Sequence, residues 1–190
     1  MTRKEESQLI ESIIHGDVHA FSLLVDQYRD HAFTLALRIV KSREDAEEVS
    51  QDAFYKAYRH LKKFKHESSF STWLYRIVYN TALSKIKKQR LQAETMEQAH
   101  LQIAEEHAIN GLSDLVAADR KKYLNLAMER LPKEEASLLS LQYTQDKDML
   151  EIAEITGLTH GNVRVKLTRA RKKLFEKLSV LLKKELNSIR

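Results

Sequence analysis

Residues 157–174 read GLTHGNVRVKLTRARKKL, and this stretch decides how the C-terminal part of the chain folds. It carries six Lys or Arg side chains and no acid, yet Val163, Leu167, Ala170 and Leu174 recur at helical spacing. A solvated run of charge needs no such stripe. The stripe therefore predicts a helix that packs on its neighbours by one narrow face and presents a basic face to a partner.

The residues before this helix predict how it is held. DMLEIAEITG at 148–157 is amphipathic, with Ile152, Ala153 and Ile155 as apolar and small contacts. Gly157 can take the positive φ that a tight turn between two helices requires. The pair predicts a helix-turn-helix, whose second helix can enter a DNA major groove. The alternative is an ordinary core helix with a charged exterior.

Composition indicates an all-helical protein. The 190 residues are 43% hydrophobic and include one Pro and four Gly, so few residues break helices. No cysteine is present, which excludes a disulfide framework and a thiolate metal site. No apolar run approaches the length of a membrane span, and the N-terminus lacks the core of a signal peptide. We expect a soluble, cytoplasmic protein without membrane insertion.

Charge is distributed in blocks along the chain. Residues 44–52 hold five acids and no base, residues 61–90 hold eight bases against one acid, and residues 91–119 hold six acids and no Lys or Arg. Two basic blocks separated by an acidic connector suggest two surfaces that meet a polyanion. Ordinary solvated helix faces would explain the same charges. The pattern predicts domains at 5–90 and 120–185, joined by an acidic linker at 91–119.

The N-terminal part shows helical spacing throughout. Asp17 is a candidate N-cap for one helix, and Ser42 or Asp45 for the next. One face of that next helix is lined by small or apolar residues: Ala46, Val49, Ala53 and Ala57. FKHESSF at 64–70 interrupts the pattern, so we expect a loop at 64–71. A long, apolar-rich helix at 72–90 follows.

Three stretches together resemble one known family. They are DAEEVSQDAFYKAY at 45–58, FSTWLYRIVYNTALSKIKK at 70–88, and LP at 131–132 followed by EIAEITGLTHGNVRVKLTRARKKL at 151–174. In this order and spacing they resemble bacterial sigma factors of the extracytoplasmic-function (ECF) group, over about residues 8–90 and 120–180. The resemblance implies an all-α fold with two small helical domains, sigma domain 2 and a helix-turn-helix sigma domain 4, joined by a flexible linker.

The resemblance also implies partners. These are core RNA polymerase, through its beta-prime clamp helices and beta flap, and promoter DNA. An anti-sigma factor is common in the family. No cofactor is implied. In the family the linker threads the active-site cleft of the polymerase, where an acidic chain can imitate RNA. A plain tether that avoids the basic blocks explains the six acids equally well.

Candidate site residues follow from the matched motifs. The polymerase-binding set is Asp45, Glu47, Glu48, Gln51, Asp52 and Tyr55. The set for the −10 element is Phe64, Lys65, Ser68, Ser69, Phe70, Arg76, Asn80, Lys85, Lys87 and Lys88. The set for the −35 element is Arg164, Val165, Thr168, Arg169, Arg171, Lys172 and Lys173. Some residues near these sets, among them Trp73, Ile77 and Tyr79, are better explained by core packing, and Glu44 by a solvated face.

Each set has a physical rationale. Opening a duplex requires a base to leave its stack, and a polar loop beside Phe64 and Phe70 could receive it. Asn80 can donate and accept, which suits a base edge. Arg164 and Arg169 suit guanine edges in the major groove, and lysines suit phosphates.

Details depart from the family pattern. Asn162 stands where the family often has Thr, and Val165 where it often has Ser. Glu135 stands where many members carry a basic residue. The exact −35 sequence that this chain would read is therefore open, because Val165 removes a hydroxyl from the reading face.

Two other classes of function are alternatives. A helix-turn-helix regulator that acts without being a polymerase subunit explains residues 120–180 but leaves FSTWLYRIVYNTA unexplained. An enzyme is disfavoured, because no catalytic residues in a recognisable context are present. His15 and His19 have the i, i+4 spacing of zinc ligands but lack a third ligand, so no metal site is predicted. The phosphodiester chemistry would belong to the polymerase.

Overall fold

Every described segment of the chain is helical or a connecting turn. The computed structural model describes residues 3–95 and 115–188, and within these ranges it contains α-helices, one 3₁₀ turn and no strand. The helices are α1 (Arg3–Ile14), α2 (Val18–Val40), α3 (Arg43–His60), α4 (Phe70–Thr95), α5 (Leu115–Glu129), α6 (Lys133–Tyr143), α7 (Met149–Thr156) and α8 (His160–Ser188), with the 3₁₀ turn at Leu61–Lys63. The all-α prediction is confirmed.

Side-chain caps fix where several helices begin. Asp17 Oδ1 accepts from Ala20 N at 3.1 Å and starts α2. Ser42 Oγ accepts from Asp45 N at 3.2 Å, so Ser42 and not Asp45 caps α3. Asp148 and Glu151 form a capping box at the start of α7, which ends at Gly157 with φ of 73°. The predicted turn of a helix-turn-helix is confirmed.

Helix α4 differs from its predicted bounds at both ends. The sequence predicted a loop to Ser71 and a helix over 72–90, but α4 begins at Phe70 and continues to Thr95. It begins early because Ser69 Oγ accepts from Thr72 N at 3.2 Å, which satisfies one free N–H of the first turn. Residues 91–95 of the predicted linker thus belong to α4 and its residues 115–119 to α5, and residues 96–114 lie outside the described residues.

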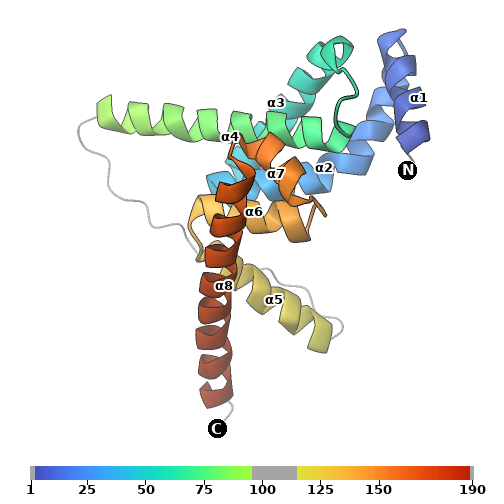
Figure 1. Ribbon diagram of the computed structural model, residues 1–190. Helices are drawn as coiled ribbons and strands as arrows, with labels where there is room; N and C mark the ends of the chain where they lie inside the picture. The colour runs from blue at the N-terminus through green and yellow to red at the C-terminus, as the bar shows by residue number, and fades with distance from the viewer. Residues whose placement is uncertain (1–2, 96–114, 189–190) are drawn as a thin grey trace.

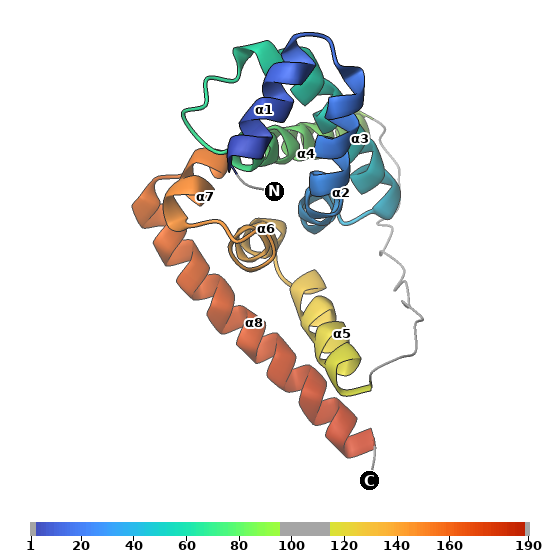
Figure 2. The ribbon, with the colours of Figure 1, turned by 90° about the vertical axis from the view of Figure 1, so that its right-hand side faces the viewer.

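The helices form two groups that pack against each other. The N-terminal helix group, α1–α4, lies at one end, and α6 and α7 of the C-terminal helix group, α5–α8, lie against α2 and α4 (Figures 1 and 2). Helix α8 starts beside α7 and runs away from the N-terminal group, with α5 packed against it. The predicted helix-turn-helix therefore packs against α4 of the N-terminal group through its first helix, α7.

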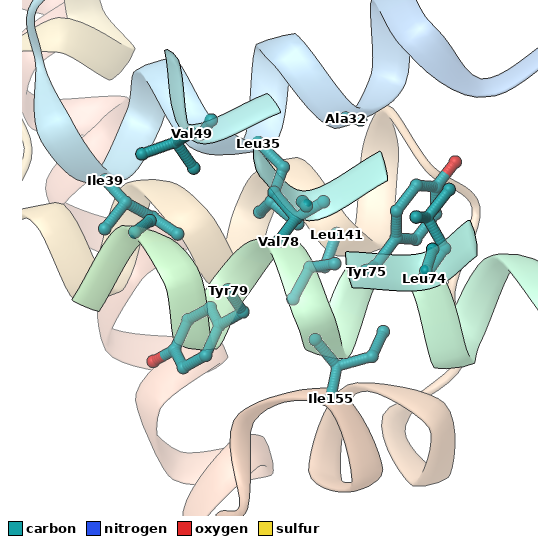
Figure 3. Packing of buried hydrophobic residues seen from close by; sticks show 14 of the residues in the cluster. Ala32, Leu35, Ile39, Val49, Leu74, Tyr75, Val78, Tyr79, Leu141 and Ile155 are labelled. Atoms are coloured by element: carbon teal, nitrogen blue, oxygen red, sulfur yellow. The ribbon is translucent and has the colours of Figure 1, made fainter. Parts of the chain in front are cut away.

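One apolar core runs through both groups. Leu141 of α6 and Ile155 of α7 gather with Leu35, Leu74 and Val78 of α2 and α4 (Figure 3). Each of these five side chains is at most 1% exposed. Burial of such side chains stabilises a fold by about 1.5–3 kcal/mol each. The two helix groups are therefore held together by apolar contact as well as by polar bonds.

Polar bonds from α2 secure the same interface. Arg38 Nη2 donates to Asn125 Oδ1 at 2.7 Å. Lys41 Nζ donates to Glu129 O and Leu131 O, each at 2.8 Å, and so satisfies carbonyl oxygens at the end of α5. Burial lowers the pKa of Lys41, and the charge of Lys133 adds to this effect.

None of the described helices combines the length and apolar character that crossing a bilayer demands.

Candidate nucleic-acid interface

The basic face of α8 lies opposite the stripe that anchors the helix. Val163, Leu167 and Ala170 are completely buried, and Leu174 is half-buried, as the sequence predicted. All members of the −35 set are exposed; Val165, Thr168 and Lys172 lie opposite the stripe, and it is flanked by Arg164, Arg169, Arg171 and Lys173. Val165 is 48% exposed. The exposed face thus combines cations with apolar methyl groups.

The cations of this face divide into held and free side chains. Arg171 donates to Tyr143 Oη at 2.9 Å and to Gln142 Oε1 at 2.7 Å. Lys173 pairs with Glu135 at 2.6 Å. By contrast, no described residue makes a hydrogen bond or ion pair with the side chains of Arg164, Arg169 or Lys172. These three side chains are therefore available to bind an anionic partner.

The two phenylalanines of the −10 set lie in the core. Phe70 is 0% and Phe64 8% exposed, and their rings pack on each other with centroids 6.0 Å apart. Trp73 packs on both, at 5.2 and 5.8 Å. Neither phenylalanine has a free face for a flipped base in this conformation. This differs from the prediction of a base pocket, because the Phe64 and Phe70 rings turn inward and pack with Trp73, where burial stabilises them.

The remaining residues of the −10 set lie at the surface. Lys65, Arg76, Asn80, Lys87 and Lys88 are exposed. Ser68, Ser69 and Lys85 are half-buried. Arg76, Asn80 and Lys87 share one face of α4, since their spacing follows the helical period. Trp73 and Ile77 are half-buried and Tyr79 is 6% exposed, so the core-packing interpretation of these three is confirmed.

Ser69, one of the two half-buried serines of this set, has partners that the sequence did not predict. Ser69 Oγ accepts from Lys147 Nζ at 3.2 Å, and Thr72 beside it donates to Glu151 Oε1 at 2.6 Å. Lys147 and Glu151 come from the segment that opens α7, nearly eighty residues away. The D-x-x-E pattern of 148–151 signals a capping box. Nothing in that pattern signals a contact with α4.

The acidic face of α3 is where the sequence predicted it. Ala46, Val49, Ala53 and Ala57 are all buried. The polymerase-binding set points outward: Glu47, Glu48, Gln51 and Tyr55 are exposed, and Asp45 and Asp52 are half-buried. Asp52 pairs with Lys56 at 2.7 Å.

Helix α4 meets this acidic face through a lysine of the −10 set. Lys85 Nζ lies 2.6 Å from Glu48 Oε2 and 3.2 Å from Asp45 Oδ1. Gln89 also donates to Asp45 at 2.9 Å. Burial works against ionisation of Asp45, but the bonds from Gln89 and Lys85 outweigh it, so the pKa of Asp45 is lowered. The polymerase-binding set and the −10 set therefore meet at a groove of about 370 Å³ between α3 and α4.

The histidine pair shows no feature of a metal site. His15 Nδ1 lies 2.8 Å from the backbone oxygen of Glu11, and His19 is exposed. Among the described residues no three His, Asp or Glu side chains gather closely enough to hold a metal ion.

Comparison with known proteins gives the family. Sigma-70 region 2 matches residues 24–92, and Sigma-70 region 4 matches residues 121–174. The RNA polymerase sigma-H factor of Pseudomonas aeruginosa is 31% identical, over 96% of this chain and 98% of its own length. The ECF sigma-E factor of Escherichia coli K12 is 31% identical, over 93% and 95%. ECF sigma factor SigW of Bacillus subtilis is 28% identical, over 89% and 94%.

Solved structures share the fold. Sigma factor RpoE of Bartonella quintana, in a complex with the anti-sigma factor NepR, is 24% identical with a TM-score of 0.68, over 86% of this chain and 99% of that one. CnrH, in a complex with the cytosolic domain of CnrY, is 22% identical with a TM-score of 0.62, over 90% and 96%.

These matches cover both helix groups, whereas a stand-alone helix-turn-helix regulator does not account for the region 2 match. The chain belongs to the ECF group of the sigma-70 family and is an alternative sigma factor, which binds core RNA polymerase and promoter DNA and directs transcription initiation.

Proposed function

We propose that the exposed face of α8 reads the −35 element of the promoter. The observation that carries this proposal is the two-sided build of α8, with Val163, Leu167 and Ala170 buried and Arg164 and Arg169 exposed and unpaired among the described residues. A helix fixed by one face can present the other to the major groove at a defined depth. Arg164 and Arg169 can contact guanine edges, and the methyls of Val165 and Thr168 can contact thymine. Lys172 suits a contact with a DNA phosphate. Arg171 and Lys173 can exchange their present partners on α6 for phosphates of the DNA backbone.

We assign the −10 element to α4 and the loop before it. Arg76 and Asn80 offer polar groups from one exposed face of α4, and Lys65, Ser68 and Ser69 belong to the loop. Lys85, Lys87 and Lys88 extend this surface with charges that suit phosphates. Phe64 and Phe70 are buried, so we give them the role of supporting the loop from beneath.

The acidic face of α3 is the proposed site for core polymerase. Glu47, Glu48, Gln51 and Tyr55 are exposed, and Asp45 and Asp52 lie at the edge toward α4. Basic groups on the beta-prime clamp helices would pair with these acids. The beta flap would contact the C-terminal domain. On this proposal the domains predicted at 5–90 and 120–185 act as domains 2 and 4, with α4 running on to Thr95 and α5 beginning at Leu115 within the predicted linker of 91–119.

The chain itself supplies binding and strand separation but no bond chemistry. Phosphodiester formation belongs to the polymerase, so the protein has no catalytic residue and acts in the cytoplasm with that enzyme. The sigma factor RpoE was solved with an anti-sigma factor, and we propose the same class of partner for this chain.

The decisive experiment is reconstitution with core RNA polymerase, followed by sequencing of the 5′ ends of the transcripts. We expect transcripts that start downstream of a shared pair of promoter elements and that depend on the added chain. Duplex DNA footprints by the chain alone, with no effect on transcript starts, would contradict the proposal.

A further inference from the structure

A cluster of packed rings leads from the core to the loop before α4. The Phe64 ring lies at its centre, with ring centroids at 6.0 Å from Phe70 and 5.2 Å from Trp73. The imidazole of His66 packs on the same Phe64 ring, with centroids 4.6 Å apart and an interplanar angle of 52°. Phe64 and Phe70 are buried, and Trp73 is half-buried, but His66 is exposed. The cluster therefore presents the His66 ring to solvent.

The backbone of the loop fixes where this ring lies. His66 has φ of 57°, in the left-handed region that few residues with a side chain adopt, although histidine enters it more readily than most. Such a conformation persists only where surrounding contacts support it. The packing of the imidazole on Phe64, two residues earlier, is a contact of this kind. The ring is therefore held against Phe64.

The described part of the fold makes no further use of the imidazole. Its ring nitrogens form no hydrogen bond with a described residue, and an exposed ring adds little to the core. Backbone strain collects at sites where a ligand or partner binds. An exposed ring that a strained turn holds in place therefore indicates a binding role.

The ring cluster lies at one end of the face of α4 that carries Arg76 and Asn80. Trp73 and Asn80 are seven residues apart on α4, which is two helical turns, so they lie along one line of the helix. Phe64 packs on Trp73, and His66 packs on Phe64. The exposed imidazole therefore belongs to the same surface as the groups that we assign to the −10 element.

Opening the duplex requires a surface of this chemistry. A base that leaves its stack loses the contact of its neighbours and binds well to the face of an aromatic side chain. The rings of Phe64 and Phe70 have no free face for this role, because they are buried. His66 is an exposed ring with an apolar support beneath it.

We propose that the His66 imidazole is the stacking surface for a base that leaves the duplex at the −10 element, with Phe64 supporting the imidazole from the core side. His66 lies outside the −10 set that the sequence predicted. The inference rests on the proposed function, since it requires the loop before α4 to meet the −10 element. It adds which ring of the loop receives the base.

The test uses the holoenzyme, reconstituted from core polymerase and the full chain, and a promoter whose start site has been mapped. Its probe is a single-stranded oligonucleotide that carries the −10 element, prepared intact and with one abasic nucleotide at each position in turn. His66→Asn removes the ring but tolerates the left-handed backbone. We expect it to lower the affinity for the intact strand by about tenfold, within the range that one stacked base contributes.

The abasic strands separate stacking from a general effect on the loop. Where the stacked base is missing, the parent holoenzyme and His66→Asn should bind equally, because there is nothing left to stack. At every other position the tenfold difference should remain. His66→Phe restores a ring and should recover most of the affinity. Where His66→Phe does not fold, the comparison of the parent with His66→Asn on the abasic strands decides alone.

The matched control is His60→Asn at the end of α3. His60 is also exposed, and its side chain makes no cap hydrogen bond. No described ring packs on it, so the substitution removes an imidazole from nearby without touching the ring cluster. We expect the affinity for every strand to stay at the parent value.

The results distinguish the two proposals. An unchanged affinity after His66→Asn, or the same loss on every abasic strand, overturns the stacking role of His66. A folded His66→Phe as weak as His66→Asn also overturns it. A parent holoenzyme that starts transcription but binds every abasic strand as well as the intact one overturns the −10 assignment of the loop itself.

Discussion

Thr72 Oγ1 donates a hydrogen bond of 2.6 Å to Glu151 Oε1, and these two residues join the first turn of α4 to the first turn of α7. Glu151 thereby serves two structures at once. Its second oxygen accepts from Asp148 N at 3.2 Å and completes the capping box of the helix-turn-helix. The same carboxylate therefore stabilises the DNA-binding unit and ties it to the other helix group.

Acid should weaken this contact. Burial opposes ionisation of Glu151, but hydrogen bonds from Lys147 and Thr72 outweigh it, so the pKa of Glu151 lies below its ordinary value of 4.5. The stabilisation is therefore complete above pH 4.5 and is lost as pH falls through the lowered pKa. Glu151→Gln should reduce the free energy of unfolding at neutral pH, and its difference from the parent chain should shrink below pH 4.5. Urea unfolding of both chains at each pH measures this difference, and a difference independent of pH would contradict it.

Arg169→Ala should relax selectivity for the −35 element. Loss of one arginine contact to a guanine edge costs about 1–3 kcal/mol of discrimination against the wrong base. Transcription from matched and altered −35 promoters, with the reconstituted holoenzyme, measures the ratio, and Arg164→Ala should behave similarly. The control is Lys172→Ala, which should weaken binding to both promoters equally and lower the salt dependence. Equal loss on both promoters for Arg169→Ala would remove this arginine from the reading set.

Asp52→Lys should weaken binding to core polymerase. The change places a second cation beside Lys56, which now pairs with Asp52 at 2.7 Å, and opposes the basic groups expected on the clamp helices. Like charges facing each other across an interface cost several kcal/mol. Competition against the parent chain for a limiting amount of core measures the effect. Asp30→Lys on α2 changes the net charge equally at an exposed position and should compete normally.

Leu74→Ala should destabilise both helix groups together. Leu74 is fully buried in the core that α4 shares with α6 and α7, and such a truncation costs about 2–5 kcal/mol. We expect a single urea transition, displaced to lower urea. Leu83→Ala on the same helix removes a side chain that is 44% exposed and should change stability by less than about 0.5 kcal/mol. Two transitions, of which only one moves, would show that the groups unfold independently.

Gly157→Ala and Gly161→Ala should change stability in opposite directions. Neither glycine has an atom within 4 Å of an added Cβ, so space is not the deciding factor. Gly157 has φ of 73°, where an L side chain costs about 1–2 kcal/mol. Gly161 lies in the first turn of α8, where alanine gains up to about 1 kcal/mol. Thermal unfolding of the two variants compares them, and a stabilised Gly157→Ala would refute the role of the turn.

The sequence predicted those features that depend on local periodicity and capping. The turn at Gly157 and the cap at Asp17 are each decided within about one helical turn, and the stripe that begins at Val163 follows from helical spacing along α8. The buried face of α3 was predicted for the same reason.

What the sequence could not predict depends on distant partners. The sequence predicted a base pocket beside Phe64 and Phe70. Two aromatic residues near a polar loop do not indicate whether their rings turn toward solvent or toward the core. The pairing of Lys147 with Ser71 needs two segments 76 residues apart to meet. Nothing within either segment marks the other as its partner.

Lys41 carries one last implication. Its ammonium group donates to the backbone oxygens of Glu129 and Leu131. The C-terminal end of α5 is therefore capped by a residue of the N-terminal helix group. When the two helix groups separate, those oxygens lose their donor, and α5 should fray at its C-terminal end. Faster amide hydrogen exchange in the last turn of α5 would then report the separation of the two helix groups.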